Sequence, residues 1–274
     1  VWELIGNAGI DSTVVRCPVS YPPDPVRGKM LSGMGVPDLR GGLGTGTVFT
    51  TDPDAKPRES ENLVRVEVGP GGTIETTVIG PRHPKTGADL KFDIKIGIDE
   101  PDRSITIRSA GEPREIVLRE GEWSDWLRVK FKLGLLQTVA GHLRFYLIRT
   151  GPGFELYASP VNFDVDAPLF PISHPADYAG DLARAVGLYH TTGMVEDHTA
   201  LNNERIGEAA FLDQCETAWQ EREAMMMSEL ERHDRGLFYC LFDTPDRVQH
   251  LFWRFREPDH PANRGRDPQP EFER

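Results

Sequence analysis

Residues Gly236 to His250 read GLFYCLFDTPDRVQH. The segment begins with an apolar, aromatic-rich run, Leu237 to Phe242, whose length and composition are typical of a buried strand in a parallel sheet. The letters DTP that follow break the strand. Proline favours the first position of a helix, so we expect a helical turn to begin at Pro245. In that turn Asp246 and His250 lie four residues apart and point the same way.

This pair of side chains has two possible roles. A carboxylate and an imidazole just past the carboxyl end of a buried strand lie where open α/β sheets place their chemistry. Both groups are ligands that zinc accepts, so together they could hold one divalent metal. The alternative is a surface hydrogen bond between two side chains on one helix face.

The flanking sequence favours the metal. The pattern P-D-x-x-x-H after an apolar strand, followed by Leu251-Phe252-Trp253 and Asp259-His260-Pro261, resembles the alkaline phosphatase superfamily. It looks most like the type I phosphodiesterase or nucleotide pyrophosphatase branch and the predicted phosphohydrolases and phosphomutases related to it. In that family an Asp and a His four residues apart bind one of two metal ions. The resemblance therefore implies Asp246 and His250 as metal ligands.

The same resemblance implies the cofactors and the substrate class. The family uses two divalent metals, usually zinc with manganese as the alternative, and acts on a small phosphorylated substrate. His260 could orient a metal ligand through a hydrogen bond, or it could serve only as a turn residue.

Part of the family pattern has no counterpart in the sequence. The second metal would need an early strand Asp, a Thr or Ser nucleophile and a late Asp-His step, and we find no candidate for any of them. The chain also starts at Val1 and stops at Arg274 within unfinished segments. We therefore expect a fragment of a metal-dependent phosphohydrolase or phosphodiesterase, inactive alone, with weak metal binding or none.

A glycine-rich segment near the start of the chain could contribute to substrate binding. Residues Met30 to Gly44 read MLSGMGVPDLRGGLG and resemble the corresponding segment of the predicted phosphohydrolases. In the functional interpretation its backbone approaches a substrate phosphate and Arg40 anchors that phosphate. In the other interpretation the glycines only allow a tightly turning loop.

The hydrophobic pattern divides the chain into two regions. Residues 1–47 and 167–274 alternate helices with apolar strands, which predicts an incomplete α/β core. We expect it to be part of an alkaline-phosphatase-like open sheet with helices on both faces. Residues 48–166 form an all-β insertion resembling an antiparallel sandwich or barrel, because short runs there alternate at period two. The expected strands are 63–68, 73–79, 90–98, 104–107, 115–118, 127–133 and 142–149. Residues 208–233 are the longest predicted helix.

A different class of function is a non-catalytic binding module. Its β insertion would recognise a carbohydrate or a protein partner, and Trp123 and Trp126 are the aromatic candidates for that surface. Both tryptophans could equally be core residues. An enzyme should bring Asp246, His250 and the glycine-rich loop to one cleft, whereas a binding module should expose an aromatic patch.

The amino-acid composition limits the classes of partner that this protein can bind. The 274 residues carry a formal net charge of −12, which disfavours binding to a nucleic acid polymer. The three cysteines are far apart and lie in apolar surroundings, so we expect free thiols and a cytoplasmic protein. No apolar run approaches the length of a membrane span.

Overall fold

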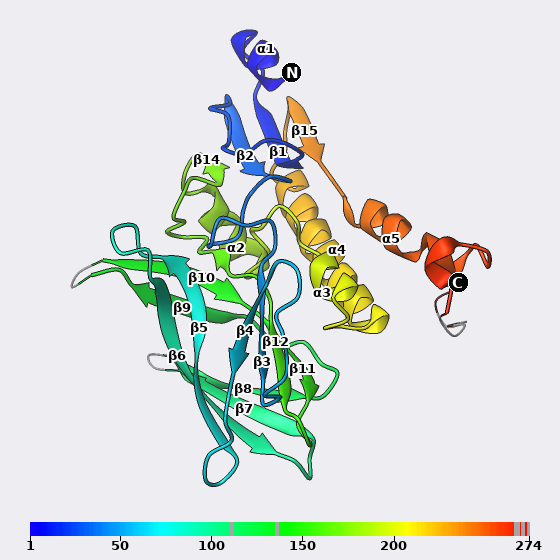
Figure 1. The fold of residues 1–274 in the computed structure, drawn as a ribbon. Helices are drawn as coiled ribbons and strands as arrows, with labels where there is room; N and C mark the ends of the chain where they lie inside the picture. The colour runs from blue at the N-terminus through cyan, green and yellow to red at the C-terminus, as the bar shows by residue number, and fades with distance from the viewer. Residues whose placement is uncertain (110–111, 135–136, 266–268, 270–271, 273–274) are drawn as a thin grey trace.

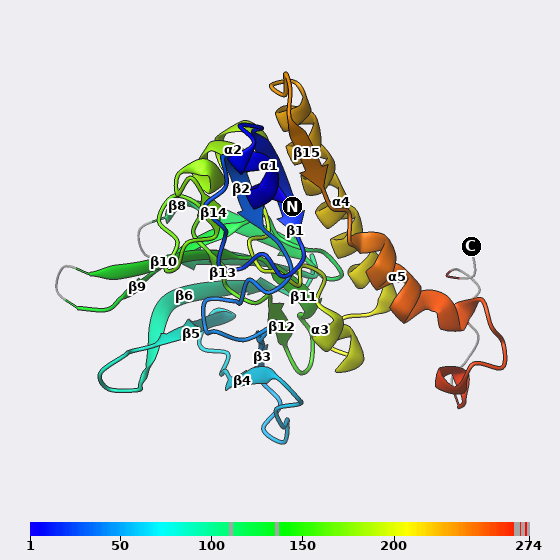
Figure 2. The same ribbon diagram turned by 90° about the horizontal axis from the view of Figure 1, so that it is seen from above.

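The fold was obtained as a computed structural model, which describes residues 1–109, 112–134, 137–265, 269 and 272. The chain has mixed α/β content. A small sheet with helices forms the upper part of the molecule in Figure 1, and a larger β region lies below it. Figure 2 shows the helix that follows the last strand extending away from both parts toward the C-terminus.

The small sheet has four strands in the order β14-β2-β1-β15. Its centre is β1 (Ser12–Cys17), which pairs in parallel with β2 (Gly28–Ser32) and with β15 (Leu237–Cys240). The short β14 (Ser173–His174) runs antiparallel along β2. The parallel arrangement predicted for strand 237–242 is therefore confirmed. It brings the carboxyl ends of β1 and β15 to one edge of the sheet.

Helices cover one face of this sheet. On β1, neighbouring side chains point to opposite faces. Val15 contributes to the main hydrophobic cluster, which also contains residues of α2 (Tyr178–Val186) and α4 (Glu208–Leu230). Val14 lies in a smaller cluster, to which α1 (Trp2–Asn7) contributes only its tryptophan. We expected helices on both faces of this sheet. In the described residues α2 and α4 cover one face, and only Trp2 of α1 packs on the other.

One expectation about β15 was wrong. The apolar run was predicted to be a buried strand over residues 237–242, but β15 ends at Cys240 and all four of its residues are only half-buried. The physical reason is its place in the sheet, because β1 is its one hydrogen-bonded neighbour within the described chain. Phe242 has left the sheet and packs against Trp219 of α4, with ring centroids 4.8 Å apart.

The remaining helices are short. The segment after α2 leads to α3 (His198–Asn202), and the chain beyond β15 forms α5 (Thr244–Phe252), η1 (Trp253–Phe255) and η2 (Pro261–Asn263). Pro245 lies in the first turn of α5, as predicted. The predicted long helix is also confirmed as α4, and it ends three residues earlier than expected.

The β region contains eleven strands in three sheets within the described residues. The sheet orders are β13-β10-β9, β11-β12-β3-β4 and β5-β6-β7-β8. The strands are β3 (Gly46–Thr50), β4 (Glu61–Arg65), β5 (Thr73–Arg82), β6 (Asp89–Asp99), β7 (Ser104–Ser109), β8 (Glu112–Arg119), β9 (Leu127–Lys132), β10 (Thr138–Leu143), β11 (Phe145–Arg149), β12 (Glu155–Ala158) and β13 (Asn162–Phe163). The period-two runs are thus confirmed as strands, although the run 63–68 stays in a strand only to Arg65. The expected antiparallel pairing holds except between β3 and β4, which run parallel. The run 142–149 is split at Arg144, because β10 and β11 belong to different sheets.

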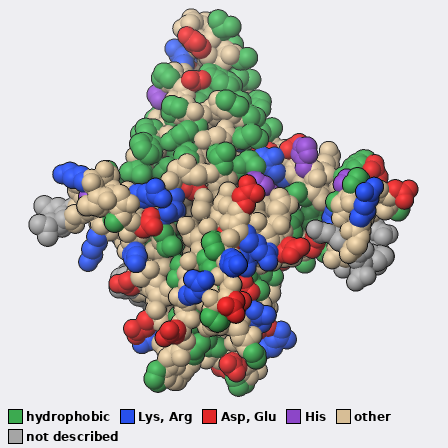
Figure 3. All heavy atoms as spheres, viewed as in Figure 1, with side chains coloured by type: hydrophobic (Ala, Val, Ile, Leu, Met, Phe, Trp, Pro, Cys, Tyr) green, Lys and Arg blue, Asp and Glu red, His purple; other side chains and the backbone are tan. Residues whose placement is uncertain are grey.

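Two hydrophobic clusters hold the regions together. The main cluster fills the β region and continues to Val15 and Leu31 of the small sheet. A second cluster joins α5 to the body of the molecule, with Phe252 stacked on Phe211 of α4 at 6.0 Å. In Figure 3 hydrophobic side chains gather over the upper part of the molecule, where β2, β1 and β15 lie, whereas charged side chains are spread over the β region.

Candidate functional site

Asp246 and His250 converge on the surface of α5. Asp246 Oδ1 lies 3.3 Å from His250 Nε2, as expected for residues four apart on a helix. The two side chains are 57% and 75% exposed, so a ligand can reach them from solvent. They belong to the first helix after β15, at the edge where β1 and β15 end. The structure therefore brings together the two residues that the sequence proposed as metal ligands.

The separation of the two atoms fits a shared metal. Two donors of one tetrahedral zinc ion, each bonded at roughly 2.0 Å, lie about 3.3 Å apart. The same separation also fits an ion pair between side chains four residues apart on a helix surface. Within the described residues, no cluster of three or more His, Cys, Asp or Glu side chains could hold a metal ion. The pair thus supplies two candidate donors, fewer than a structural zinc site uses.

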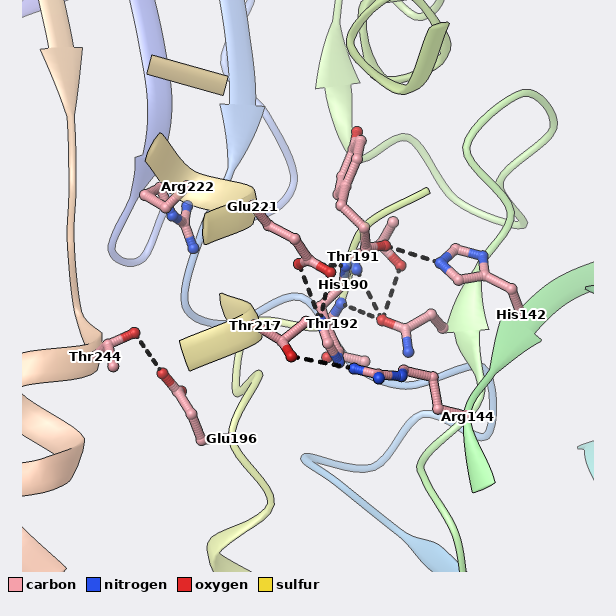
Figure 4. Close-up of polar contacts among 12 residues, drawn as sticks. His142, Arg144, His190, Thr191, Thr192, Glu196, Thr217, Glu221, Arg222 and Thr244 are labelled. Carbon is pink, nitrogen blue, oxygen red and sulfur yellow. Dashed lines mark hydrogen bonds and ion pairs between the residues drawn. The ribbon is translucent and has the colours of Figure 1, made fainter. Parts of the chain in front are cut away.

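The first turn of α5 is tied to the body of the protein by buried polar contacts. The Thr244 hydroxyl donates a hydrogen bond of 2.7 Å to Glu196, which lies just before α3 (Figure 4). Asp243 forms an ion pair with Arg222 of α4, with 3.6 Å between Asp243 Oδ1 and Arg222 Nη2. These contacts, together with Phe252, fix the helix that carries the candidate ligands.

Arg247 is the residue of this site that sequence reasoning missed. Its side chain is largely buried, and Nη1 donates to Asp246 Oδ2 at 2.8 Å. Its Nη2 lies 3.2 Å from Met194 Sδ, and its Nε lies 4.0 Å from the buried carboxylate of Glu196. The available signal was its place beside Asp246, but residues adjacent on a helix do not face each other.

An open cavity of about 740 Å³ lies beside His250. Tyr146, Leu251 and His260 are among its lining residues, so the two late histidines share one hollow. The ring of His260 also caps η2, because its Nδ1 accepts a 3.2 Å hydrogen bond from the Ala262 amide. Its role in orienting a metal ligand stays a prediction.

The glycine-rich loop does not line that cavity. Its centre is Asp38, whose buried carboxylate accepts hydrogen bonds from the backbone amides of Arg40, Gly42, Gly44 and Thr45. The guanidinium of Arg40 donates to the Gly80 carbonyl and pairs with Asp89 at 3.0 Å. The loop is therefore closed on itself and anchored to β5 and β6. The structure does not bring Arg40 together with Asp246 and His250.

Trp123 and Trp126, the aromatic candidates of the binding-module alternative, both contact other residues of the chain. Trp123 donates from Nε1 to the Ala210 carbonyl of α4 at 2.9 Å. Trp126 packs edge-on against His142 and His190, with centroid distances of 4.7 and 4.6 Å. Both side chains are half-buried between the β region and the helices. Each tryptophan therefore has a contact within the molecule, and neither is fully exposed.

A buried polar layer lies between α4 and the β region (Figure 4). Glu221 of α4 accepts from the backbone amide of His190 at 3.0 Å and contacts its Nδ1 at 2.9 Å. Burial acts to raise the pKa of Glu221, but His190 and Arg144 outweigh it and the pKa is lowered. Burial lowers the pKa of Arg16 to about 10. A cavity of about 10 Å³ lies along this layer, which leaves room for about one water.

These contacts make the layer structural. Arg16 donates to the Thr192 carbonyl at 2.6 Å and so ties the end of β1 to the segment before α3.

Among the described residues, no helix combines the length and the hydrophobicity that crossing a lipid bilayer requires. Comparison with protein-family models, with curated proteins and with solved structures found no match.

Proposed function

We propose that Asp246 and His250 bind one divalent cation of a hydrolase that acts on a small phosphate ester. Zinc is the preferred ion and manganese the alternative. The observation that carries the proposal is the 3.3 Å between Asp246 Oδ1 and His250 Nε2, because it matches two ligands of one metal. We further infer that the sheet β14-β2-β1-β15 belongs to an open sheet of the alkaline phosphatase type, with type I phosphodiesterase chemistry at its carboxyl edge.

The two donors define what this chain contributes. A bound zinc or manganese ion would polarise a phosphoryl oxygen and stabilise the charge that develops during hydrolysis. Two protein donors leave at least two positions of a tetrahedral ion to water, to substrate or to ligands outside the described residues. The pair by itself should therefore bind metal weakly, and the 274-residue chain should not turn over substrate.

The nearby hydroxyl of Thr244 is not a suitable nucleophile. It lies two residues before Asp246, but its side chain is buried and its proton is donated to Glu196. A nucleophile must reach the phosphorus atom at the exposed side of the metal pair. The residue that attacks phosphorus in our proposal is therefore a different group.

The surroundings suit a small substrate. The cavity beside His250 has apolar walls at Tyr146 and Leu251, which leave space for the organic part of a phosphate ester. The net charge of −12 opposes binding of a nucleic acid polymer. All three cysteines are free thiols, which agrees with a cytoplasmic location.

Metal binding provides the first test. Isothermal titration calorimetry with zinc should detect weak binding to the chain. The binding should be lost in Asp246→Asn and in His250→Ala. His233→Ala is the matched control, because that histidine packs on Phe238 at 5.5 Å and contacts neither candidate ligand. Zinc binding that persists in both pair variants would refute the proposed site.

Turnover provides the second test. With bis(p-nitrophenyl) phosphate and zinc or manganese, the 274-residue chain should show no hydrolysis. In any longer form of the protein that does hydrolyse phosphodiesters, Asp246→Ala should lower kcat by at least about two orders of magnitude with little change in melting temperature. Unchanged activity there would reduce the pair to a surface contact.

A further inference from the structure

The outer edge of the small sheet is unpaired within the described chain. β15 forms hydrogen bonds with β1 alone, and Figure 1 shows it at the margin of the sheet. The backbone amides of Leu237 and Leu241 donate toward β1. In a parallel ladder alternate residues bond to the same neighbouring strand, so the backbone groups of Phe238 and Cys240 point outward. Two amides and two carbonyls of β15 can therefore bind a further strand.

This edge also lacks the charges that the other sheet edges carry. Among the described strands, the edge strands of more than two residues are β4, β5, β8, β9, β11 and β15. Each of the first five contains at least one Arg, Lys, Asp or Glu, whereas residues 236–242 contain none. Charged side chains on an edge strand oppose its pairing with another chain. The sequence of β15 therefore permits a pairing that the other edges resist.

The helix α4 continues the apolar surface beside this edge. It leads directly into β15, and Trp219 of the helix packs on Phe242 with ring centroids 4.8 Å apart. The exposed apolar side chains of α4 are Trp219 (39%), Met227 (49%) and Leu230 (41%). Their spacing places them on one side of the helix. An apolar stripe next to an open strand edge is typical of a protein interface.

We propose that a second copy of this chain covers the edge, through antiparallel pairing of the two β15 strands about a two-fold axis at Tyr239. In this register Phe238 of each copy faces Cys240 of the other, so all the outward backbone groups of β15 are paired. The two Tyr239 side chains become direct cross-strand neighbours, with Cβ atoms about 5 Å apart. The axis is perpendicular to the sheet and keeps both α4 helices on one face, where their apolar stripes meet.

The charges at the two ends of β15 favour a second copy over an unrelated strand. Arg235 lies just before the strand, is exposed and has no ion-pair partner among the described residues. Asp243 lies just after it, and Asp243 Oδ1 is 3.6 Å from Arg222 Nη2, which is too far for a direct hydrogen bond. Both positions are four residues from Tyr239, so the antiparallel register places Arg235 of each copy opposite Asp243 of the other. The symmetry thus creates two attractive contacts.

The net charge of −12 opposes self-association at long range. The repulsion does not arise at the edge itself, because residues 236–242 are uncharged. Salt screens charges beyond about 8 Å at 0.15 M ionic strength. The dimer should therefore be measured at this ionic strength, where the short-range contacts decide the affinity.

Sedimentation equilibrium of the 274-residue chain over a concentration series measures the dimer. Phe238→Pro should raise its dissociation constant at least about 10-fold, because proline removes an outward amide from each copy and its ring blocks the edge. Proline is tolerated where the amide of an edge strand faces outward, so the variant should fold. Phe238→Leu is the matched control. It keeps the amide and an apolar side chain, and it should change the dissociation constant less than about 3-fold.

A charge reversal tests the register. Arg235→Glu would place two carboxylates together and should raise the dissociation constant several-fold. Lys91→Glu changes the net charge by the same amount on β6, in the β region, and should leave the dimer unchanged. Hydrogen–deuterium exchange should show the amides of Phe238 and Cys240 protected in the dimer and open at dilutions where the monomer prevails.

Each remaining outcome overturns the proposal. A chain that stays monomeric at every concentration has no such interface. Protection of the Phe238 and Cys240 amides in that monomer would show that another segment covers the edge. A dimer that Phe238→Pro leaves intact uses a different surface. If thermal unfolding shows that Phe238→Pro does not fold, the comparison of Arg235→Glu with Lys91→Glu decides, and equal effects of the two exclude the β15 pairing.

Discussion

The Thr244 hydroxyl donates a 2.7 Å hydrogen bond to Glu196, across 48 positions of the chain. This contact joins the first turn of α5 to the segment before α3. It is buried, and Glu196 Oε2 has no hydrogen-bond partner in the described part of the structure. The carboxylate therefore depends on Thr244 for its one hydrogen bond.

Removing this donor should destabilise the protein. Thr244→Val keeps the shape of the side chain but leaves a buried carboxylate unsatisfied, which costs about 1–3 kcal/mol. Urea denaturation would measure the loss. Thr244→Ser is the control, because it keeps the hydroxyl and should lose under about 1 kcal/mol. A loss in Thr244→Val no greater than that in Thr244→Ser would contradict the prediction, because the hydrogen bond would then contribute no more than the buried methyl group.

Gly236 should be intolerant of any side chain. Its φ is +106°, and a Cβ atom there would lie 2.3 Å from the Asp11 carbonyl oxygen. That oxygen accepts the 2.9 Å hydrogen bond from Leu237 that begins the pairing of β15 with β1. Gly236→Ala should therefore cost more than about 2 kcal/mol in unfolding free energy.

The matched control for Gly236 is Gly87→Ala. Gly87 also has a positive φ, of +71°, but a Cβ there would meet nothing within 4 Å. It should lose only the conformational term, about 1 kcal/mol. Denaturant melts of both variants would separate the clash from the backbone strain, and similar losses at the two positions would exclude a clash.

His142 should make stability depend on pH. Its ring is fully buried and its Nε2 donates a 2.8 Å hydrogen bond to the Tyr189 carbonyl. Burial lowers the pKa of His142 from 6.5 to about 4. Between these values the unfolded state binds more protons than the folded state, so stability falls as pH drops from 6.5 to about 4. The loss attributable to this residue is at most roughly 3 kcal/mol.

The variant that isolates this effect is His142→Gln, whose amide can still donate to Tyr189. The difference in unfolding free energy between wild type and variant should change with pH between 6.5 and about 4 and should be flat above that range. Urea melts across the pH series would measure it. A constant difference throughout would show that His142 does not titrate as its burial implies.

Local patterns in the sequence sufficed for most elements. The period-two runs became strands, the three- and four-residue spacing of apolar side chains became α4, and Pro245 marked the start of α5. The spacing of Asp246 and His250 also fixed their convergence, because four residues make about one helical turn. None of these inferences needed knowledge of distant parts of the chain.

Other surroundings depend on distant contacts, which local patterns do not indicate. The apolar run at 237–242 looked buried, yet the strand lies at a sheet edge where only β1 pairs with it. Arg40 suggested a phosphate anchor, yet the β region supplies Gly80 and Asp89 as its partners. Trp123, an aromatic candidate of the binding-module alternative, donates a hydrogen bond to the Ala210 carbonyl of α4.

The sequence by itself determined most of the helices and strands and the pairing of one acidic and one imidazole side chain on α5, since each follows from spacing along a single element. Only the tertiary structure decided which groups surround that pair. Glu196, Met194 and Arg222 reach the start of α5 from other elements, and such approaches depend on how whole elements pack. The hydrogen bond from Arg247 to Asp246 is therefore a property of the packed protein, because Met194 and Glu196 contact the arginine from another segment.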